Sequence, residues 1–451
     1  MKMRHASIAA GLLGGLVAGV FTFAAARVAH AQAPDRNPLI FVHGGSGSGA
    51  QFQSQAMRFT SNGYPLEYIR VVEYDSSVMD FPSVFTQIDA VAAELRMTTG
   101  RPQFDLVGHS RGTTISQQYL SSPERAARVA NYVNVDGRVA DALPGGVRTL
   151  ALFAGGAREV QGQIVGATNV TLPDQEHVQA VTSREAFVEM YRFLTGMEPV
   201  AGGDIVPQDQ FPVSGRAVLF PQNFGVRDGS AVLVFQLDPA NAQRMRTMMG
   251  MFNMPLASLP TDPDGFFGPF QAVRGDVYEL ALTRPDIATH TFYMEPFLRT
   301  DNLVRLNTGL PGMGLDAITA RDPATGAVII VRNKEFRGDR GPQLNDVLSI
   351  NGLDIMNPNT APSGFVGAPV AELVMDVRAD GVTNVTQVPP VFGGISFISA
   401  TDVFMPSSPP FLFTTIRTVP RGQTDLARTL TIRNQPSTAG AVSVNLNDFE
   451  Q

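Results

Sequence analysis

The chain has 451 residues, of which 44% are hydrophobic and 17% are charged, and this composition excludes a long disordered chain or a coiled coil. It contains no cysteine, which excludes a disulfide framework, a thiolate metal site and a cysteine nucleophile. The formal net charge of −7 argues against a surface that binds nucleic acid.

The first 31 residues have the pattern of a targeting segment. Lys2 and Arg4 form a basic start, small apolar residues fill 6–26, and residues 29–31 (AHA) have the small-x-small form that signal peptidases accept. We therefore expect a cleaved signal peptide over 1–31 and a secreted or periplasmic protein. A retained N-terminal membrane anchor is the alternative.

Residues 37 to 196 alternate short apolar runs with stretches of helical periodicity. The expected strands are 38–42, 68–73, 104–107, 132–135, 149–153 and 169–172. The expected helices are 51–60, 82–95, 110–120 and a last one that begins with a capping box of Thr182 and Glu185 and ends at Gly196. This alternation predicts a domain over 32–198 with a mostly parallel sheet and helices on both of its faces.

Beyond Gly196 the pattern changes to short β-branched and aromatic runs that are separated by Gly, Pro, Asp and Asn. The expected strands are 231–237, 277–282, 290–294, 327–331, 371–377, 395–399, 411–416, 430–434 and 442–446, and only 241–251 looks helical. These runs predict an all-β sandwich or barrel region over 199–451. Its length allows a division into two subdomains near 305–315.

A glycine-flanked serine follows one of the predicted strands. The sequence Gly108-His109-Ser110-Arg111-Gly112 comes directly after the apolar run FDLV and opens a helical stretch. This G-x-S-x-G pattern is typical of a nucleophile elbow, in which small neighbours allow a sharp turn and the helix start faces a developing oxyanion. It predicts Ser110 as a nucleophile and the amide of Arg111 as an oxyanion donor. A plain strand-to-helix turn is the alternative.

A second glycine-rich segment, HGGSGSG at 43–49, follows the first predicted strand. Glycine lets the backbone approach a substrate closely, so we expect the amide of Gly45, or failing that of Ser46, to complete an oxyanion hole. His43 and Gly44 would support this loop. A flexible turn is one alternative, and a phosphate-binding loop of the G-x-x-x-x-G-K-[ST] type is another, although the segment lacks the required lysine.

A serine nucleophile needs a general base, and elimination among the six histidines leaves His177. His5 and His30 lie in the targeting segment, His43 in the glycine loop and His290 in the β-rich half. His109 is next to the serine, and we expect the elbow to point it away. His177 lies in a polar loop after the last predicted strand, and a surface histidine is the alternative reading of it.

The acid that orients the histidine is expected at Asp136, at the end of the strand 132–135. This choice keeps the order Ser–acid–His, and an acid at a strand's carboxyl end already lies at the edge of the site. Glu159, after the next strand, is the alternative. Asp136 could also be an ordinary turn residue before Gly137.

Together, the HGGSGSG loop, the GHSRG elbow, Asp136 and His177 resemble the α/β-hydrolase superfamily of secreted lipases and carboxylesterases. The resemblance covers about 37–196, and the two-part layout is similar to an archaeal lipase type with a C-terminal β-domain. It implies hydrolysis of an ester or lipid through an acyl-enzyme, with a β-domain that aids substrate binding. It implies no metal, cofactor, nucleic acid or obligate protein partner, and leaves contact with a lipid interface open.

Other functions fit the same residues. A polyester depolymerase, a thioesterase or a peptidase could use the same three side chains, and a secreted binding protein could have lost the activity. The acidic turns at 262–265 (DPDG) and 321–326 (RDPATG) leave a calcium ion open beside ordinary turn chemistry.

Overall fold

The computed structural model describes residues 36–155, 162–245, 254–337, 345–360, 369–390, 397–407, 413–421 and 426–449. The expected targeting segment and Glu159 lie outside these residues. Residues from Asn37 onward form one compact unit. Among the described helices, none is both long and apolar enough to cross a membrane.

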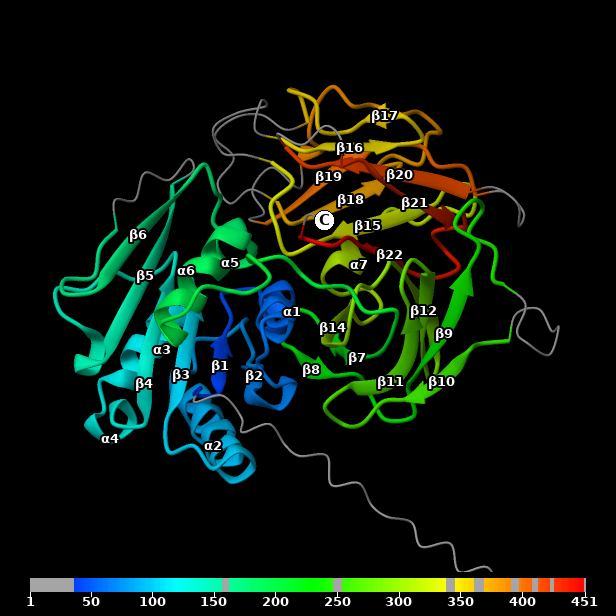
Figure 1. Ribbon diagram of the computed structural model, residues 1–451. Coiled ribbons are helices and arrows are strands. Elements are labelled where there is room, and N and C mark those ends of the chain that lie inside the picture. The colour runs from blue at the N-terminus through cyan, green and yellow to red at the C-terminus, as the bar shows by residue number, and fades with distance from the viewer. Residues whose placement is uncertain are drawn as a thin grey trace, which may run out of the picture. The chain divides into compact units, whose positions relative to one another are not determined.

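The first part of this unit contains a six-stranded parallel sheet (Figure 1). Its strands are β1 (Leu39–Val42), β2 (Ile69–Val72), β3 (Phe104–His109), β4 (Val129–Val135), β5 (Arg148–Gly155) and β6 (Thr168–Pro173). They lie in the order β2-β1-β3-β4-β5-β6, so each expected strand of this part is confirmed. The order reverses direction at β1, between β2 and β3, which is where open α/β sheets place their ligand sites.

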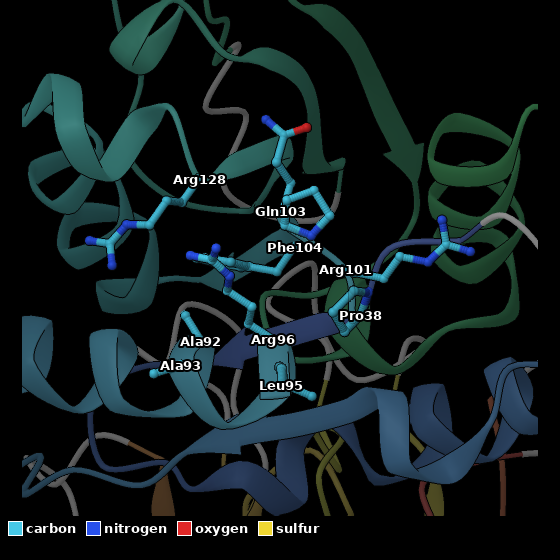
Figure 2. Close-up of a pocket in the computed structure, with 10 residues that line it drawn as sticks. Pro38, Ala92, Ala93, Leu95, Arg96, Arg101, Gln103, Phe104 and Arg128 are labelled. Atoms are coloured by element: carbon cyan, nitrogen blue, oxygen red, sulfur yellow. The ribbon is translucent and has the colours of Figure 1, made fainter. Parts of the chain in front are cut away.

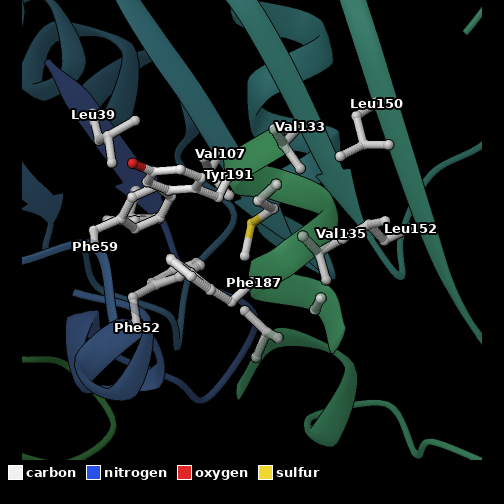
Figure 3. Packing of buried hydrophobic residues seen from close by; sticks show 14 of the residues in the cluster. Leu39, Phe52, Phe59, Val107, Val133, Val135, Leu150, Leu152, Phe187 and Tyr191 are labelled. Atoms are coloured by element: carbon white, nitrogen blue, oxygen red, sulfur yellow. The ribbon is translucent and has the colours of Figure 1, made fainter. Parts of the chain in front are cut away.

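Helices cover both faces of the sheet, as the alternation predicted. α1 (Gln53–Ser61) and α6 (Arg184–Thr195) pack with Leu39 and Phe41 of β1 on one face (Figure 3). α2 (Phe81–Thr99) and α3 (Arg111–Leu120) pack with Ile40 and Val42 on the other. The shorter helices are η1 (Gly49–Phe52), η2 (Leu66–Tyr68), α4 (Pro123–Ala126), η3 (Pro144–Gly146) and α5 (Gln179–Thr182).

The start of α6 differs from the expected capping box. Ser183 is the N-cap, and its hydroxyl accepts a hydrogen bond from the amide of Ala186. Thr182 is instead buried, and its carbonyl accepts a hydrogen bond from Arg58. Glu185 accepts a hydrogen bond from Gln175. The expected end is confirmed, because Gly196 has the left-handed φ of 70°.

The described residues of the second part form three β-sheets, which confirms the expected change of fold class. Its strands are β7 (Gln210–Leu219), β8 (Phe224–Gly225), β9 (Ala231–Leu237), β10 (Ala257–Pro260), β11 (Phe266–Val273), β12 (Val277–Arg284), β13 (Ile287–Met294), β14 (Asp301–Thr308), β15 (Ala327–Val331), β16 (Val347–Ile350), β17 (Leu353–Asp354), β18 (Ala371–Met375), β19 (Ile398–Asp402), β20 (Phe413–Val419), β21 (Arg428–Arg433) and β22 (Val442–Asn445). One helix, α7 (Leu315–Ile318), is described within it.

The prediction of a helix over 241–251 is wrong for the residues that the structure describes. Residues 241–245 are not helical, and Arg244 forms a β-bridge with Leu237. The helical spacing arose from residues of a turn that bends back on β9, where Asp238 accepts a hydrogen bond from the amide of Ala242. Residues 246–251 lie outside the described ranges.

The β-rich part has two main apolar cores that share one sheet. One core lies among β7, β9, β11, β12, β13 and β14, and the other among β15, β16, β18, β20, β21 and β22. The eight-stranded sheet runs β10-β9-β12-β13-β22-β15-β18-β19, so β22 joins the two halves by pairing in parallel with both β13 and β15. The last described strand therefore ties residues on both sides of 305–315 into one sheet.

Candidate active site

Ser110 stands at the sharp turn between β3 and α3. Its φ of 52° and ψ of −119° lie in a region that non-glycine residues rarely adopt. A Cβ atom on Gly112 would lie 2.1 Å from the carbonyl oxygen of Val42, and one on Gly108 would lie 2.7 Å from the carbonyl oxygen of Gly112. Glycine at 112 thus lets α3 approach β1 so closely, and glycine at 108 lets α3 fold back against the end of β3.

Ser110, His177 and Asp136 are brought together by hydrogen bonds. Nε2 of His177 lies 2.9 Å from Oγ of Ser110, and Nδ1 of His177 lies 2.5 Å from Oδ2 of Asp136. Ser110 follows β3, Asp136 follows β4, and His177 lies in the loop after β6. Since the strands are parallel, their carboxyl ends meet at one edge of the sheet, and this brings the three side chains within reach.

The charge state of Asp136 fits the orientation of the imidazole. Burial by itself raises the pKa of Asp136, but the hydrogen bond and charge of His177, with the amide of Ala154, bring it below its usual range. That amide donates to Oδ1 at 2.8 Å, which leaves Oδ2 for His177. An ionised Asp136 accepts a hydrogen bond from the N–H at Nδ1 of His177, so the proton stays on Nδ1 and the lone pair of Nε2 is free to accept a proton from Ser110.

The glycine loop lies against the serine. A Cβ atom on Gly44 would be 3.0 Å from Cβ of Ser110, and one on Gly45 would be 2.9 Å from the guanidinium carbon of Arg111. The amide of Gly44 donates to Oε1 of Gln51 at 3.0 Å. The loop backbone therefore passes directly beside Ser110, which is the placement that oxyanion donors require.

His43 holds the base of this loop. Its ring stacks on Tyr74 with centroids 4.1 Å apart, and its Nδ1 donates to the carbonyl of Gly44 at 2.8 Å. Complete burial lowers the pKa of His43 to about 4, so the ring is neutral at pH 7. The hydroxyl of Tyr74 donates to the carbonyl of His43 at 2.8 Å.

His109 does not point away from the site as expected. Its ring is buried 4.8 Å from the ring of His177, with Nε2 3.1 Å from the carbonyl oxygen of His177 and Nδ1 3.2 Å from Oε1 of Gln51. The ring of His109 therefore faces the loop that carries His177. Burial, followed by the nearby His177, lowers the pKa of His109 to about 3, so this ring is also neutral.

Several residues of the β-rich second part, called the β-region from here on, contact the glycine loop or the loop that carries His177. They were not predicted from the sequence. Glu335 accepts hydrogen bonds from the loop that carries His177, and Phe397 stacks on His177 with centroids 6.4 Å apart. Asn223 donates to the carbonyl of Gly47 in the glycine loop at 2.9 Å. Because these residues are far along the chain from the motifs, no local sequence pattern connects them with the site. Gln51 was missed although it lies only two residues after the glycine loop, since nothing in the sequence marks it as buried.

A cavity of about 100 Å³ lies elsewhere in the domain, lined by residues such as Leu95, Arg96 and Phe104 (Figure 2). Pro38 precedes β1 and Phe104 begins β3, so this cavity lies at the amino edge of the sheet, opposite the serine. It does not belong to the candidate active site.

The acidic turns do not gather into a metal site in the part of the chain that is described. No three His, Asp or Glu side chains converge there as metal ligands would. In the first turn, Oδ1 of Asp262 accepts a hydrogen bond from the amide of Phe266 at 2.8 Å, which is ordinary turn chemistry.

Comparison with protein families gives matches over most of the chain. Residues 36–129 match the lipase (class 2) family, and residues 209–311 match the lipase C-terminal domain. These two matches support an α/β-hydrolase of the lipase type with a C-terminal β-domain. A further C-terminal domain family matches residues 314–450 of the chain. A comparison with curated proteins gave no match.

The hydrolase is also similar to solved structures of low identity. The mature form of lipase BlEst2 from Bacillus licheniformis is 16% identical, with a TM-score of 0.30 over 36% of this chain and 93% of that one. The propeptide form is 11% identical, with a TM-score of 0.31 over 89% and 93%. A protein from Listeria innocua is 13% identical, with a TM-score of 0.29 over 36% and 96%.

Proposed function

We propose that the chain is a secreted serine hydrolase of carboxylic esters, a lipase or carboxylesterase that acts through an acyl-enzyme. The observation that carries the proposal is the hydrogen-bonded series Asp136–His177–Ser110 on a strained strand-to-helix turn. A nucleophile, a base within reach of it and an acid that orients the base are the three parts that acyl transfer needs.

In the first half of the reaction, Oγ of Ser110 attacks the ester carbonyl while Nε2 of His177 takes its proton. The carbonyl oxygen becomes an oxyanion, which the amides of Gly45 and Arg111 would bind. Asp136 keeps the imidazole oriented and stabilises its charged form. The intermediate then collapses, the bond to the alcohol oxygen breaks, and His177 gives its proton to the leaving alcohol.

In the second half, water replaces the alcohol. His177 accepts a proton from this water as its oxygen attacks the acyl carbon, and the same two amides would hold the second oxyanion. The bond to Oγ of Ser110 breaks, His177 returns the proton to that oxygen, and the carboxylic acid leaves. Every proton transfer uses one nitrogen, Nε2 of His177, which lies 2.9 Å from Oγ of Ser110.

The lipase families that match support a lipid or ester as the substrate. We propose secretion from the basic and apolar pattern of residues 1–31, with cleavage after Ala31. The proposed chemistry uses side chains and backbone amides of this chain throughout and calls for no cofactor. A thioesterase would use the same steps with a thiol as the leaving group, and a polyester depolymerase would use them on the ester bonds of a polymer.

The test is hydrolysis of p-nitrophenyl butyrate and palmitate, together with labelling by a serine-directed fluorophosphonate. We expect wild type to hydrolyse and to be labelled, and Ser110→Ala to lose both. Ser116→Ala is the matched control, because Ser116 lies on the same helix and is buried. If wild type neither hydrolyses any ester nor takes the label, the enzyme proposal fails and an inactive binding protein becomes the better account.

A further inference from the structure

A carboxylate from the β-region contacts the loop that carries His177. Oε1 of Glu335 accepts a hydrogen bond from the amide of Val178 at 2.5 Å, and Oε2 accepts one from the amide of Gln179 at 2.9 Å. Glu335 is only 1% exposed; its bond to Val178 is buried and its bond to Gln179 is partly buried. These two amides stand at the start of α5, where no helical carbonyl precedes them to act as acceptor.

The peptide between His177 and Val178 is held at both of its polar ends. Its carbonyl oxygen lies 3.1 Å from Nε2 of His109, and its N–H donates to Glu335. His109 belongs to the elbow, whereas Glu335 belongs to the β-region after β15. The plane of this peptide, from which the His177 side chain projects, is therefore fixed from both parts of the molecule.

The backbone of Glu335 is itself held in place by two arginines of a buried ionic cluster. Its carbonyl oxygen accepts hydrogen bonds from Arg332 at 2.6 Å and from Arg421 at 2.8 Å. Both arginines also pair with Asp346, which is completely buried, at 2.5 and 3.4 Å. Since a shift of Glu335 would break this buried ionic cluster, its carboxylate can hold the loop in one position.

We propose that Glu335 is a positioning residue for His177, so that the β-region completes the catalytic arrangement as well as any substrate-binding surface. This inference rests on the proposed function of His177. Hydrolysis needs the imidazole within hydrogen-bond reach of Ser110 and Asp136 at once, and displacement of about 1 Å is enough to cost roughly a hundredfold in rate. Glu335 acts through the backbone of the loop and does not touch the reacting atoms.

The test compares full-length Glu335→Gln with wild type on p-nitrophenyl butyrate. Glutamine keeps the size but presents one oxygen to two amides, so we expect kcat to fall about 10- to 100-fold, with KM changed less than about twofold. Glu372→Gln is the matched control, because Glu372 is another fully buried β-region carboxylate, paired with Arg337 and Thr401. We expect it to alter stability but leave kcat unchanged.

Hydrogen exchange at the amides of Val178 and Gln179 gives a readout that does not depend on activity. We expect faster exchange there in Glu335→Gln and no change in β3 or β4. The inference is overturned if kcat and exchange match wild type, if KM rises while kcat is kept, or if Glu372→Gln lowers kcat equally. If wild type itself takes no fluorophosphonate label, the proposed function fails, and the exchange result still decides whether Glu335 fixes the loop.

Discussion

At the scale of single residues, the two oxygens of Asp136 have separate tasks. Oδ1 is bound to the amide of Ala154 at 2.8 Å, and Oδ2 faces Nδ1 of His177 at 2.5 Å. The backbone contact decides which oxygen is left for the imidazole, and so fixes the direction from which the ring is held. An amide in place of the carboxylate would present its NH₂ group to one of two donors.

Asp136→Asn is therefore expected to lower kcat on p-nitrophenyl butyrate by about 10³- to 10⁴-fold, because the wrong imidazole tautomer is favoured. The control is Asp89→Asn, since Asp89 pairs with Arg125 and Arg128 and contacts none of the three proposed catalytic residues in the described structure. Steady-state rates of both variants make the comparison. A loss of less than tenfold would remove Asp136 from its proposed role and bring forward Glu159.

Asp105 on β3 carries a pH dependence of stability. Burial raises the pKa of Asp105 to about 7, against smaller opposing effects of hydrogen bonds from Asn131 and Asn37. Among the described residues, its Oδ2 has no hydrogen-bond partner. The folded state therefore holds a proton that the unfolded chain releases near pH 4.

Because the folded state binds this additional proton, the free energy of unfolding falls as the pH rises. Stability from Asp105 is fully present below about pH 4 and is lost as the pH rises through about 7. Asp105→Asn removes the titration but keeps an oxygen for Asn131. Between about pH 4 and pH 7, the free energy of unfolding of the variant, relative to that of wild type, should therefore increase by about 1.4 kcal/mol per pH unit. Urea unfolding at pH 5, 6, 7 and 8 measures it. Parallel pH profiles of the two proteins would contradict the assignment.

At the scale of elements, the approach of α3 to β1 decides the elbow. The carbonyl oxygens of Val42 and His43 come so close to Gly112 that a Cβ atom there would lie 2.1 and 2.7 Å from them. Main-chain atoms of a buried strand cannot move aside as a flexible side chain can. The second glycine of the elbow is thus required by packing between helix and sheet.

Gly112→Ala is expected to destabilise the fold by about 3 kcal/mol or more, because the helix must move off the strand. Gly146→Ala is the control: Gly146 has φ of 70°, but no atom lies within 4 Å of its added Cβ. That variant should lose only about 1 kcal/mol, from left-handed strain. Urea midpoints compare the two, and equal losses would show that the contact with β1 is unimportant.

At the scale of the whole molecule, ion pairs couple the β-region to the glycine loop. Glu73, after β2, is paired with Arg305 of β14, and both oxygens of Glu73 lie 3.2 Å from the amide of Gly49. Burial alone would raise the pKa of Glu73, but Arg305 and His43 lower it below its usual range. Like Glu335 on the other side of the site, Arg305 makes a loop of the hydrolase domain depend on the β-region.

Arg305→Met is expected to destabilise the protein by about 3–5 kcal/mol, since it leaves Glu73 buried without its partner. Adding Glu73→Gln should restore a large part of that loss, because the unpaired charge is then removed. Urea unfolding of the two single variants and the double variant measures the coupling. A double variant no more stable than Arg305→Met would mean that the pair is not the origin of the effect.

The same coupling explains why a chain cut near Gly196 would be a poor test of the β-region. Such a cut removes Glu335, Arg305 and Asn223 together, and each contacts a loop beside Ser110 or His177, or the carboxylate that holds one. Loss of activity would then follow from displaced loops, whatever the β-region does for the substrate. Single substitutions in the full chain separate the two effects.

The sequence by itself determined the local features of this protein. Strand and helix positions in residues 37–196, the elbow around Ser110 and the end of α6 at Gly196 depend on periodicity and on steric needs of neighbouring residues, which short stretches contain. The order of the motifs also predicted that Asp136 and His177 lie at the edge with Ser110, because parallel strands end on the same side.

Only the tertiary structure decided what depends on distant residues. Three features arise where separate segments of the chain meet. They are the inward position of His109, the burial of Gln51, and the hydrogen bonds from the amides of Val178 and Gln179 to Glu335. The same holds for β22, which joins two cores by pairing with β13 and β15. A hydrogen bond or a strand pairing between such segments has no period and no spacing, so it leaves no pattern along the chain.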